Sequence, residues 1–322
     1  MNVSNARYAL TLLFAALLLT AGCSGSGSGS DDKMGRISLG VSDHPMHDAA
    51  KVCIAFTEVE LKPKDGPALM ADKLTGAADF LNVNLLEFQD MNAAPLLMDF
   101  ELSAGEYNWI RLGVNAVLGG MGGFDDDLGE YDMNPMGPCV GDESYLMMKG
   151  PDEETPGEIH NLYMPSGAEN GLKLHSNIVV PDVGTANFTA EFDLLKSVAY
   201  PGGLAPDAVI RPTIRLVNNL EVGALTGVVD DTLVIDGCAP TVFIFQDDGL
   251  DVALDAANSL TSAMVNEQIN DTDMIEYHYT IGFLPGGDYE IAFSCDDGVN
   301  LNPPNGKPAT VVEGDVVEVG LP

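Results

Sequence analysis

The sequence predicts an all-β protein with two antiparallel β-sandwich domains after a signal peptide and a flexible tether. Two observations predict this class: apolar and polar residues alternate over short segments, and turns rich in Gly and Pro separate them. Strand-like segments occur at residues 37–41, 52–56, 81–85, 209–217, 222–229, 241–245, 275–283 and 311–319. Helical windows are few: residues 250–264 are the best candidate, and residues 84–88 could form one turn.

The amino-acid composition excludes a disordered chain and a nucleic-acid-binding protein. The 322 residues contain 14 Lys and Arg against 49 Asp and Glu, so the formal net charge is −35. Hydrophobic residues make up 46% of the chain, which is enough to build a core and excludes wholesale disorder. A field this negative repels phosphate backbones, so nucleic acid is not an expected partner.

Residues 1–22 have the pattern of a lipoprotein signal peptide. Arg7 supplies a positive start, and the apolar run at residues 9–19 is too short to span a bilayer of about 30 Å. The run ends at Cys23 in a stretch of small residues that resembles a bacterial lipobox. Cys23 is therefore the predicted lipidation site, with a plain secretory signal as the alternative.

The segment 23–34 is predicted to be a tether. Ser and Gly alternate at residues 24–30, and such a sequence cannot offset the entropy of ordering. Ser24, not Asp, follows Cys23, which resembles the outer-membrane default of lipoprotein sorting. The expected location is the outer membrane, where the lipid holds a body that faces the periplasm or the cell surface.

Four cysteines remain after Cys23, an even number that suits an oxidising compartment. Four cysteines allow three pairings, and separately folding domains favour Cys53–Cys139 and Cys238–Cys295. Each bridge would contribute about 4 kcal/mol by loop entropy. The alternative for each cysteine is a free buried thiol.

The folded region is predicted to divide into a β-sandwich domain at residues 35–217 and a small β-sandwich at residues 218–322. One local unit occurs in both: residues 102–107 and 284–289 each read Leu, turn residues, Gly, acid and Tyr, and each runs into a strand. The Gly permits a positive φ, while Tyr107 or Tyr289 can fill the edge of a core with its hydroxyl satisfied.

Six segments of the first domain resemble a known family. They are GRISLGVSDHP at 35–45, VELKP at 59–63, GEYNWIRL at 105–112, PSGAENGLKL at 165–174, FDLLKSV at 192–198 and RPTIRLV at 211–217. In this order they are similar to the bacterial lipoprotein family with the domain of unknown function numbered 4382. The second domain resembles carboxypeptidase-regulatory-like or prealbumin-like sandwiches, within the broader Ig-like class. The family has no established activity, so the resemblance assigns no functional residues.

Cations are the first candidate for a binding site. After the signal, the chain has only four arginines, and three of them lie in apolar strand-like segments: Arg111, Arg211 and Arg215. A cation among apolar neighbours must be paired, because leaving it alone costs several kcal/mol. One hypothesis is a polar lock between sheets with Asp43, Glu191 or Asp193 as partners. The other is a pocket for an anionic ligand, lined by these arginines and Lys173.

Acidic loops are the second candidate. Carboxylates suit Ca²⁺, and the residues of two loops at strand ends could meet at one end of the second sandwich: Asp247, Asp248, Asp251, Asp296 and Asp297. The alternative is a solubilising surface. The stretch with Asp43, His44 and His47 could also ligate a transition metal, but a solvated loop is the favoured interpretation. Calcium is thus the one cofactor that the sequence suggests.

Catalysis is poorly supported by the sequence, and its carboxylates are too numerous to single out a catalytic pair. No nucleophile elbow surrounds Ser166, and no phosphate-binding glycine loop occurs. Trp109, the single tryptophan, could stack on a sugar ring, although its alternating strand favours core packing. We therefore predict a non-enzymatic, membrane-anchored envelope lipoprotein that binds a glycan or a protein partner. The alternatives are a structural spacer, with a role in envelope assembly, and a Ca²⁺-dependent adhesion module.

Overall fold

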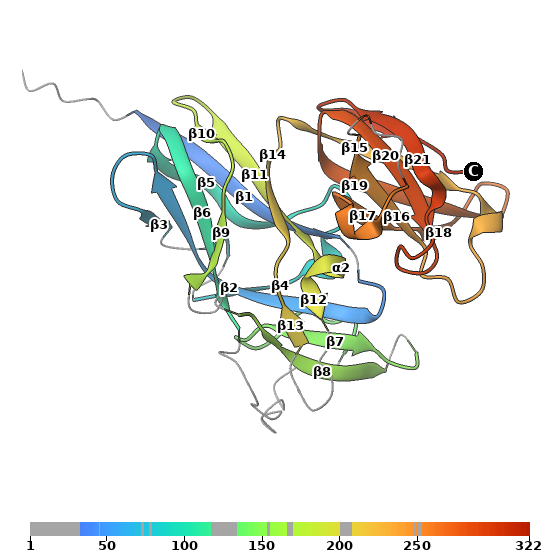
Figure 1. The fold of residues 1–322 in the computed structure, drawn as a ribbon. Helices are drawn as coiled ribbons and strands as arrows, with labels where there is room; N and C mark the ends of the chain where they lie inside the picture. The colour runs from blue at the N-terminus through green and yellow to red at the C-terminus, as the bar shows by residue number, and fades with distance from the viewer. Residues whose placement is uncertain are drawn as a thin grey trace, which may run out of the picture. The chain divides into compact units, whose positions relative to one another are not determined.

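The computed structural model describes residues 33–44, 46–71, 74–76, 79–116, 134–152, 155–165, 170–199, 208–247, 249 and 253–322. These residues belong to one compact unit that begins at Lys33. β-Strands dominate it, as predicted (Figure 1). The described helices are single turns: η1 (Leu85–Glu87), α2 (Leu194–Ser197), η3 (Asp231–Leu233) and η4 (Ala256–Asn258). None of the described helices could cross a membrane.

A four-stranded sheet forms one layer of the first sandwich. Its strand order is β14-β11-β1-β5, with bounds β1 (Met34–His44), β5 (Ala94–Ser103), β11 (Thr185–Asp193) and β14 (Ile214–Asn218). The central pair, β1 and β11, is parallel, whereas the other neighbours are antiparallel. The predicted all-β sandwich class is confirmed, and the one parallel pair in this sheet is possible because β1 and β11 lie far apart in the chain and are joined by a long connection.

A ten-stranded sheet forms the second layer. Its main path is β10-β6-β2-β7-β8-β13-β12, while β3 and β4 pair with β2 and β9 pairs with β6. The bounds are β2 (Ala49–Pro63), β3 (Leu69–Ala71), β4 (Leu81–Asn84), β6 (Gly105–Asn115), β7 (Tyr145–Lys149), β8 (Pro156–Tyr163), β9 (Leu172–Leu174), β10 (Ile178–Val180), β12 (Val198–Ala199) and β13 (Ala208–Ile210).

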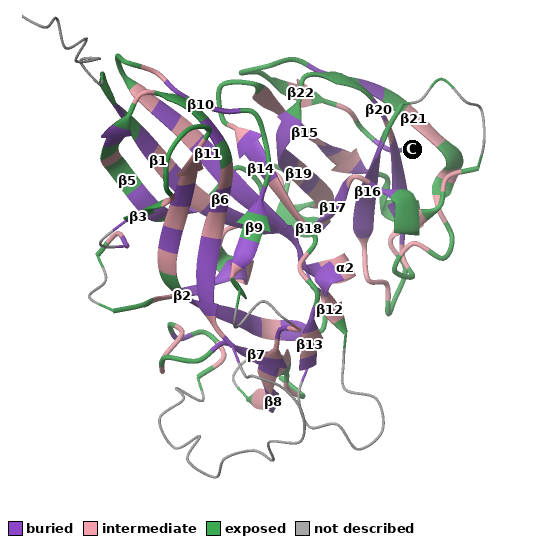
Figure 2. Cartoon of the chain, turned by 60° about the vertical axis from the view of Figure 1, so that its left-hand side comes forward, coloured by how far each residue is buried: buried purple, intermediate pink, exposed green. Residues whose placement is uncertain are grey.

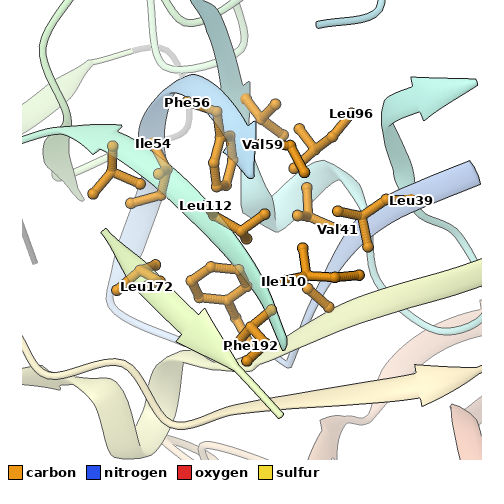
Figure 3. Packing of buried hydrophobic residues seen from close by; sticks show 14 of the residues in the cluster. Leu39, Val41, Ile54, Phe56, Val59, Leu96, Ile110, Leu112, Leu172 and Phe192 are labelled. Carbon is orange, nitrogen blue, oxygen red and sulfur yellow. The ribbon is translucent and has the colours of Figure 1, made fainter. Parts of the chain in front are cut away.

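The core of the first sandwich lies between these two sheets. Alternate residues of β1, such as Ile37, Leu39 and Val41, are fully buried, because successive side chains of a strand point to opposite faces. Figure 3 shows Leu39 and Val41 against Ile110 of β6. The rings of Phe56 and Phe192 meet edge to face, with centroids 6.3 Å apart. Figure 2 shows the buried positions along these strands.

Two four-stranded sheets form the second sandwich, and they enclose a hydrophobic core of their own. One has the order β18-β19-β15-β22, and the other has the order β17-β16-β20-β21. Their bounds are β15 (Val222–Val229), β16 (Thr241–Gln246), β17 (Thr261–Met264), β18 (Asn266–Ile269), β19 (Ile275–Pro285), β20 (Gly287–Ser294), β21 (Asn302–Val311) and β22 (Val316–Glu318). The predicted division at residue 217 falls near the turn between β14 and β15 and stays a prediction.

The structure pairs the cysteines as the sequence favoured. Cys53 bonds to Cys139, and Cys238 bonds to Cys295. The first bridge fastens the segment before β7 to the buried strand β2, and the second joins the segment before β16 to the end of β20. Each bridge therefore closes a long loop within one sandwich, as expected for an oxidising compartment. Cys23, the signal peptide and the Ser/Gly tether lie outside the described residues.

The repeated unit forms the same corner in both sandwiches. The hydroxyl of Tyr107 donates to the carbonyl oxygen of Ser103, and that of Tyr289 donates to Pro285, at 2.7 Å each. Both tyrosine rings are buried. The preceding Gly105 has a φ of 140°, a conformation that residues with a Cβ rarely adopt. The prediction of a buried Tyr with a satisfied hydroxyl is confirmed.

Three predicted elements are wrong. Residues 250–264 do not form a helix: their described part contains only the turn η4 and the strand β17. The segment 209–217 is interrupted at residues 211–213, where Pro212 removes a ladder donor. The segment 311–319 divides at Gly314, which has a φ of 77° and lies in a turn. In the two interrupted strands, a single residue, Pro212 or Gly314, breaks the pairing, and the alternation of apolar residues does not show where it does so.

Candidate binding face on the ten-stranded sheet

The outer face of β6 carries Trp109 and Arg111. The intervening Ile110 and the following Leu112 point into the core and are fully buried, so their neighbours must point outward. Trp109 is half-buried on this outer face. The prediction that this residue packs in the core is therefore wrong. The physical reason is a register shift beside Asn108, where β2 and β6 pair Lys62 with Trp109 but Pro63 with Tyr107.

Two lysines flank the indole ring of Trp109. Lys173 lies on β9, where it pairs in register with Arg111, and its Nζ atom is 4.4 Å from the ring centroid. This distance is that of a cation–π contact. On the other side, Lys62 of β2 is directly opposite Trp109. We call these three residues, Lys62, Trp109 and Lys173, the Trp109 face.

Arg111 is neutralised by its neighbours. Its guanidinium lies 2.7 Å from a carboxylate oxygen of Glu60 and 3.4 Å from one of Glu58, and it also donates to the backbone carbonyl of Asn170 at 3.4 Å. Glu60 is its direct cross-strand partner, which explains the pairing. Arg111 therefore links β6 to the carboxylates of β2 and is not a free anion receptor.

The two lysines of the Trp109 face have no carboxylate partner among the described residues. Within the described part of the chain, neither Lys62 nor Lys173 forms an ion pair. Lys62 donates to the backbone carbonyl of Gly66, and Lys173 contacts the indole ring. Lys64 lies nearby in sequence, but a carboxylate oxygen of Glu106 is 2.5 Å away from its Nζ atom. In a chain with a net charge of −35, two cations that form no ion pair with any described residue lie beside one aromatic ring.

A shallow groove continues from this face. It has a volume of about 300 Å³ and is lined by Met164, Pro165, Asn170, Gly171, Leu172, Lys173, Leu174, Pro212 and Ile214. Lys173 borders both the groove and the ring, so a chain-like ligand on the ring could extend along β9. Glycine at 171 keeps the groove open to backbone approach: its φ is 65°, and a Cβ there would come within 2.7 Å of the carbonyl oxygen of Leu112.

The four predicted ligand-binding cations do not form one pocket. Arg111 and Lys173 meet across β6 and β9, whereas Arg215 lies on the four-stranded sheet. Arg211 is exposed between β13 and β14 and lies in no strand, so it does not share a strand face with Arg215. The structure thus brings two of the four residues together.

Arg215 instead forms a partly buried ion pair with Glu191. The two residues are direct partners in the register of β11 and β14, and the guanidinium donates to the carboxylate. Glu191 was one of the partners named for a polar lock, but the lock joins two strands of one sheet rather than two sheets. The other carboxylate oxygen of Glu191 lies 3.0 Å from Nε2 of His44, which completes a buried chain of three groups.

Asp43 and His44 are buried at the end of β1, so the interpretation of this stretch as a solvated loop is wrong. Burial raises the pKa of the Asp43 carboxyl well above its ordinary value, and the neighbouring Asp193 raises it further. The parallel pairing of β1 with β11 sets Phe192 opposite Asp43 and Asp193 opposite His44, at the shared end of the two strands. Sequence reasoning missed this cluster, and the available signal was the run Ser42-Asp43-His44 at the end of an alternating strand.

The two acidic loops lie at opposite ends of the second sandwich. Asp247 follows β16 at the end that pairs with the start of β20, whereas Asp296 follows the end of β20. Because the two strands are antiparallel, their carboxyl ends point in opposite directions, so the expectation that these loops meet is wrong. Asp296 accepts hydrogen bonds from Ser294 and Asn300. Asp297, the next residue, is exposed and has a φ of 53°.

Metal chemistry gains no support from the described residues. Among them, no group of three or more His, Cys, Asp or Glu residues is arranged to hold a metal ion. Asp248 and Asp251 lie outside the described residues. Calcium binding therefore stays a prediction of the sequence.

A known protein family matches the first sandwich. The family described as "Domain of unknown function (DUF4382)" matches residues 34–208, which is more than half of the chain. The protein is therefore a member of this family, and the resemblance found in the sequence is confirmed. No curated protein matches the chain.

Three solved structures show a remote similarity to the chain. The Bacillus anthracis TIE protein has 9% sequence identity and a TM-score of 0.18; the match covers 89% of this chain and 34% of that one. The minor pilin GBS52 of Streptococcus agalactiae has 10% identity and a TM-score of 0.19, with coverages of 88% and 94%. The fimbrial anchor protein Mfa2 of Porphyromonas gingivalis has 11% identity and a TM-score of 0.16, with coverages of 87% and 82%. TM-scores this low do not establish a shared fold.

Proposed function

We propose that this protein is a lipid-anchored envelope protein whose first sandwich binds an anionic glycan on the Trp109 face. The observation that carries the proposal is the half-buried indole between two lysines that have no carboxylate partner in the described part of the chain. An aromatic ring on an open sheet face offers an apolar surface on which the CH groups of a sugar ring can stack. The lysines add attraction for a carboxylate or sulfate group on that sugar.

The lysines of the Trp109 face favour an anionic glycan over a neutral one. The protein as a whole repels anions, so an acidic polymer binds only where cations gather locally. Lys173 lies over the ring, and a neutral sugar would have to displace it before stacking. An acidic sugar can use the displaced ammonium group as a partner. The arrangement therefore favours uronate-containing or sulfated chains.

Export supports the envelope setting of this proposal. Two disulfide bonds need an oxidising compartment, and the N-terminal segment with Cys23 has the pattern of an acylated export signal. Mass spectrometry of the protein purified from membranes would test the anchor. We expect acylation of Cys23 and loss of membrane association in Cys23→Ala; a native chain that retains Met1 and carries no lipid contradicts it.

Glycan binding can be measured by the fluorescence of the single tryptophan. Because Trp109 is the only Trp, its fluorescence reports this face directly. We expect polygalacturonate and a sulfated polysaccharide to change its emission and dextran to leave it unchanged. Lys173→Met and Lys62→Met should each weaken acidic-glycan binding at least tenfold. Lys33→Met is the matched control, because Lys33 is an exposed lysine that pairs with Asp182.

The Lys173 variant also separates the alternatives. If Lys173 only covers the ring, Lys173→Ala exposes the indole and strengthens the binding of dextran. If no acidic or neutral glycan binds and envelope proteins are captured instead, the face recognises protein, and the glycan proposal is wrong.

A further inference from the structure

A second surface lies on the hairpin of β18 and β19, in the other sandwich. β18 is the edge strand of its sheet, and all four of its residues are exposed. At the tip, Ile269 and Ile275 are direct cross-strand partners, with exposed fractions of 75% and 53%. Met274 beside them is 61% exposed. The tip of the hairpin therefore exposes three large apolar side chains to solvent.

The hairpin tip is held in one conformation by Asn270. Its side-chain oxygen accepts from the backbone N–H groups of Thr272 and Met274, at 2.9 and 3.0 Å, and its side-chain amide donates to Glu276 at 2.8 Å. Its backbone N–H also donates to the carbonyl of Met274. The apolar side chains are thus displayed on an ordered element, so a partner would lose little free energy to ordering this surface.

The hydrogen-bond register leaves one edge of β18 open. The backbone bond between residues 270 and 274 makes them a hydrogen-bonded pair, so 268 and 276 are the next such pair along the antiparallel ladder. The backbone groups of Glu267 and Ile269 therefore point away from β19. An edge of this kind can pair with an added strand.

Charge determines which partner fits. The hairpin carries Glu267, Asp271, Asp273 and Glu276, and Lys307 is the only Lys or Arg of residues 218–322. A second copy of this chain, an anionic membrane surface and a nucleic acid would all be repelled. An extended segment that alternates apolar residues with Lys or Arg would set its apolar residues on the face of the isoleucine pair and its cations on the face of Glu276.

We propose that the β18 edge binds an extended, basic peptide segment of an envelope protein by strand addition. The apolar side chains of the segment would lie beside Ile269, on the face that also carries Ile275, and its cations would lie on the opposite face, which carries Glu276. This surface is distinct from the Trp109 face, so either proposal can fail without the other.

The test uses three synthetic eight-residue peptides with the full-length protein: (Lys-Val)₄, (Lys-Gly)₄ and (Glu-Val)₄. We expect (Lys-Val)₄ to bind at least tenfold more tightly than the other two, because it alone combines positive charge with strand propensity. Hydrogen exchange should slow at Glu267 and Ile269 on binding. Equal binding of (Lys-Gly)₄, or protection confined to other strands, would overturn the proposal in favour of unspecific charge attraction.

Matched variants test whether the peptide pairs with the open edge of β18. Glu267→Pro removes an outward N–H group, and we expect it to weaken (Lys-Val)₄ binding about tenfold more than Glu267→Gln, which removes only the charge. Gln268→Ala is the control, since its backbone groups face β19. The double variant Ile269→Thr, Ile275→Thr should also weaken binding at least tenfold. If the free protein forms a dimer that Glu267→Pro abolishes, a second copy is the occupant and the proposal is wrong.

Discussion

At the scale of single residues, burial decides what each charged group does. Glu191 is almost fully buried; the Arg215 guanidinium pairs with one of its carboxylate oxygens, and Nε2 of His44 lies 3.0 Å from the other. Asp43 is equally buried but stands beside a second carboxyl group, that of Asp193. Burial and the neighbouring carboxyl group of Asp193 raise the pKa of Asp43 well above its ordinary value, which favours its protonated form.

Asp43 gives the fold a pH dependence whose sign follows from its pKa. The folded state binds the proton more tightly than the unfolded chain, so this contribution is fully present below the ordinary pKa of 3.8 and is lost as the pH rises through the raised pKa. Asp43→Asn removes the ionisable group. We expect the variant to exceed the wild type in free energy of unfolding at pH 8 and to lose this advantage near pH 3.

Urea unfolding followed by Trp109 fluorescence at several pH values measures this difference in the first sandwich. Exposed Asp236→Asn serves as the surface control. An Asp43→Asn protein that is less stable than the wild type at pH 8 would show that the carboxylate stabilises the fold in its ionised form.

At the scale of elements, the two sandwiches use the same corner to close a strand pair. In each, a Leu and a Tyr enter the core on either side of a tight Gly turn, and the Tyr hydroxyl returns to the carbonyl four residues earlier. The repetition follows from local chemistry, because a buried hydroxyl must find a partner and this carbonyl lies within reach.

Tyr107→Phe and Tyr289→Phe each remove that hydrogen bond and leave the ring. We expect both substitutions to lower the free energy of unfolding by about 0.5–1.5 kcal/mol, with an additional cost if the freed carbonyl is cut off from water. Chemical denaturation followed by circular dichroism provides the measurement. A neutral effect at one corner and a large effect at the other would contradict the equivalence of the two units.

At the scale of the whole molecule, one disulfide bond stabilises each sandwich. The loop closed by Cys238 and Cys295 spans 57 residues, and that closed by Cys53 and Cys139 spans 86. The chain-entropy relation gives about 4 kcal/mol for a loop of either length. Both bridges therefore act mainly on the unfolded chain.

Replacing Cys238 and Cys295 with Ser should lower the stability of the second sandwich by about 2–5 kcal/mol. Thermal unfolding of the variant, compared with the Cys53→Ser, Cys139→Ser protein, measures each contribution. The Trp109 signal should follow the second variant and not the first, because Trp109 lies in the first sandwich. A thiol assay that finds free cysteines among these four in the native protein would refute the pairing.

Much of the fold could be predicted from local pattern, and the candidate site could not. Alternation along residues 222–229 predicted β15 with its observed bounds, because the period of two is a property of the strand itself. The face of Trp109 depended on a register shift beside Asn108, which is a relation between two strands. Likewise, Arg111 and Lys173 are far apart in sequence and meet only because β9 pairs with β6.

The amino-acid order alone determined the all-β class, the family of the first sandwich and the favoured cysteine pairing, because these depend on composition, local period and compartment. Tertiary structure decided which cations are neutralised and which stay available, and it separated the two acidic loops. The physical reason is that charge pairing and side-chain exposure depend on which strands become neighbours. Strand order and register are fixed by the packing of the whole sheet, which no single segment encodes.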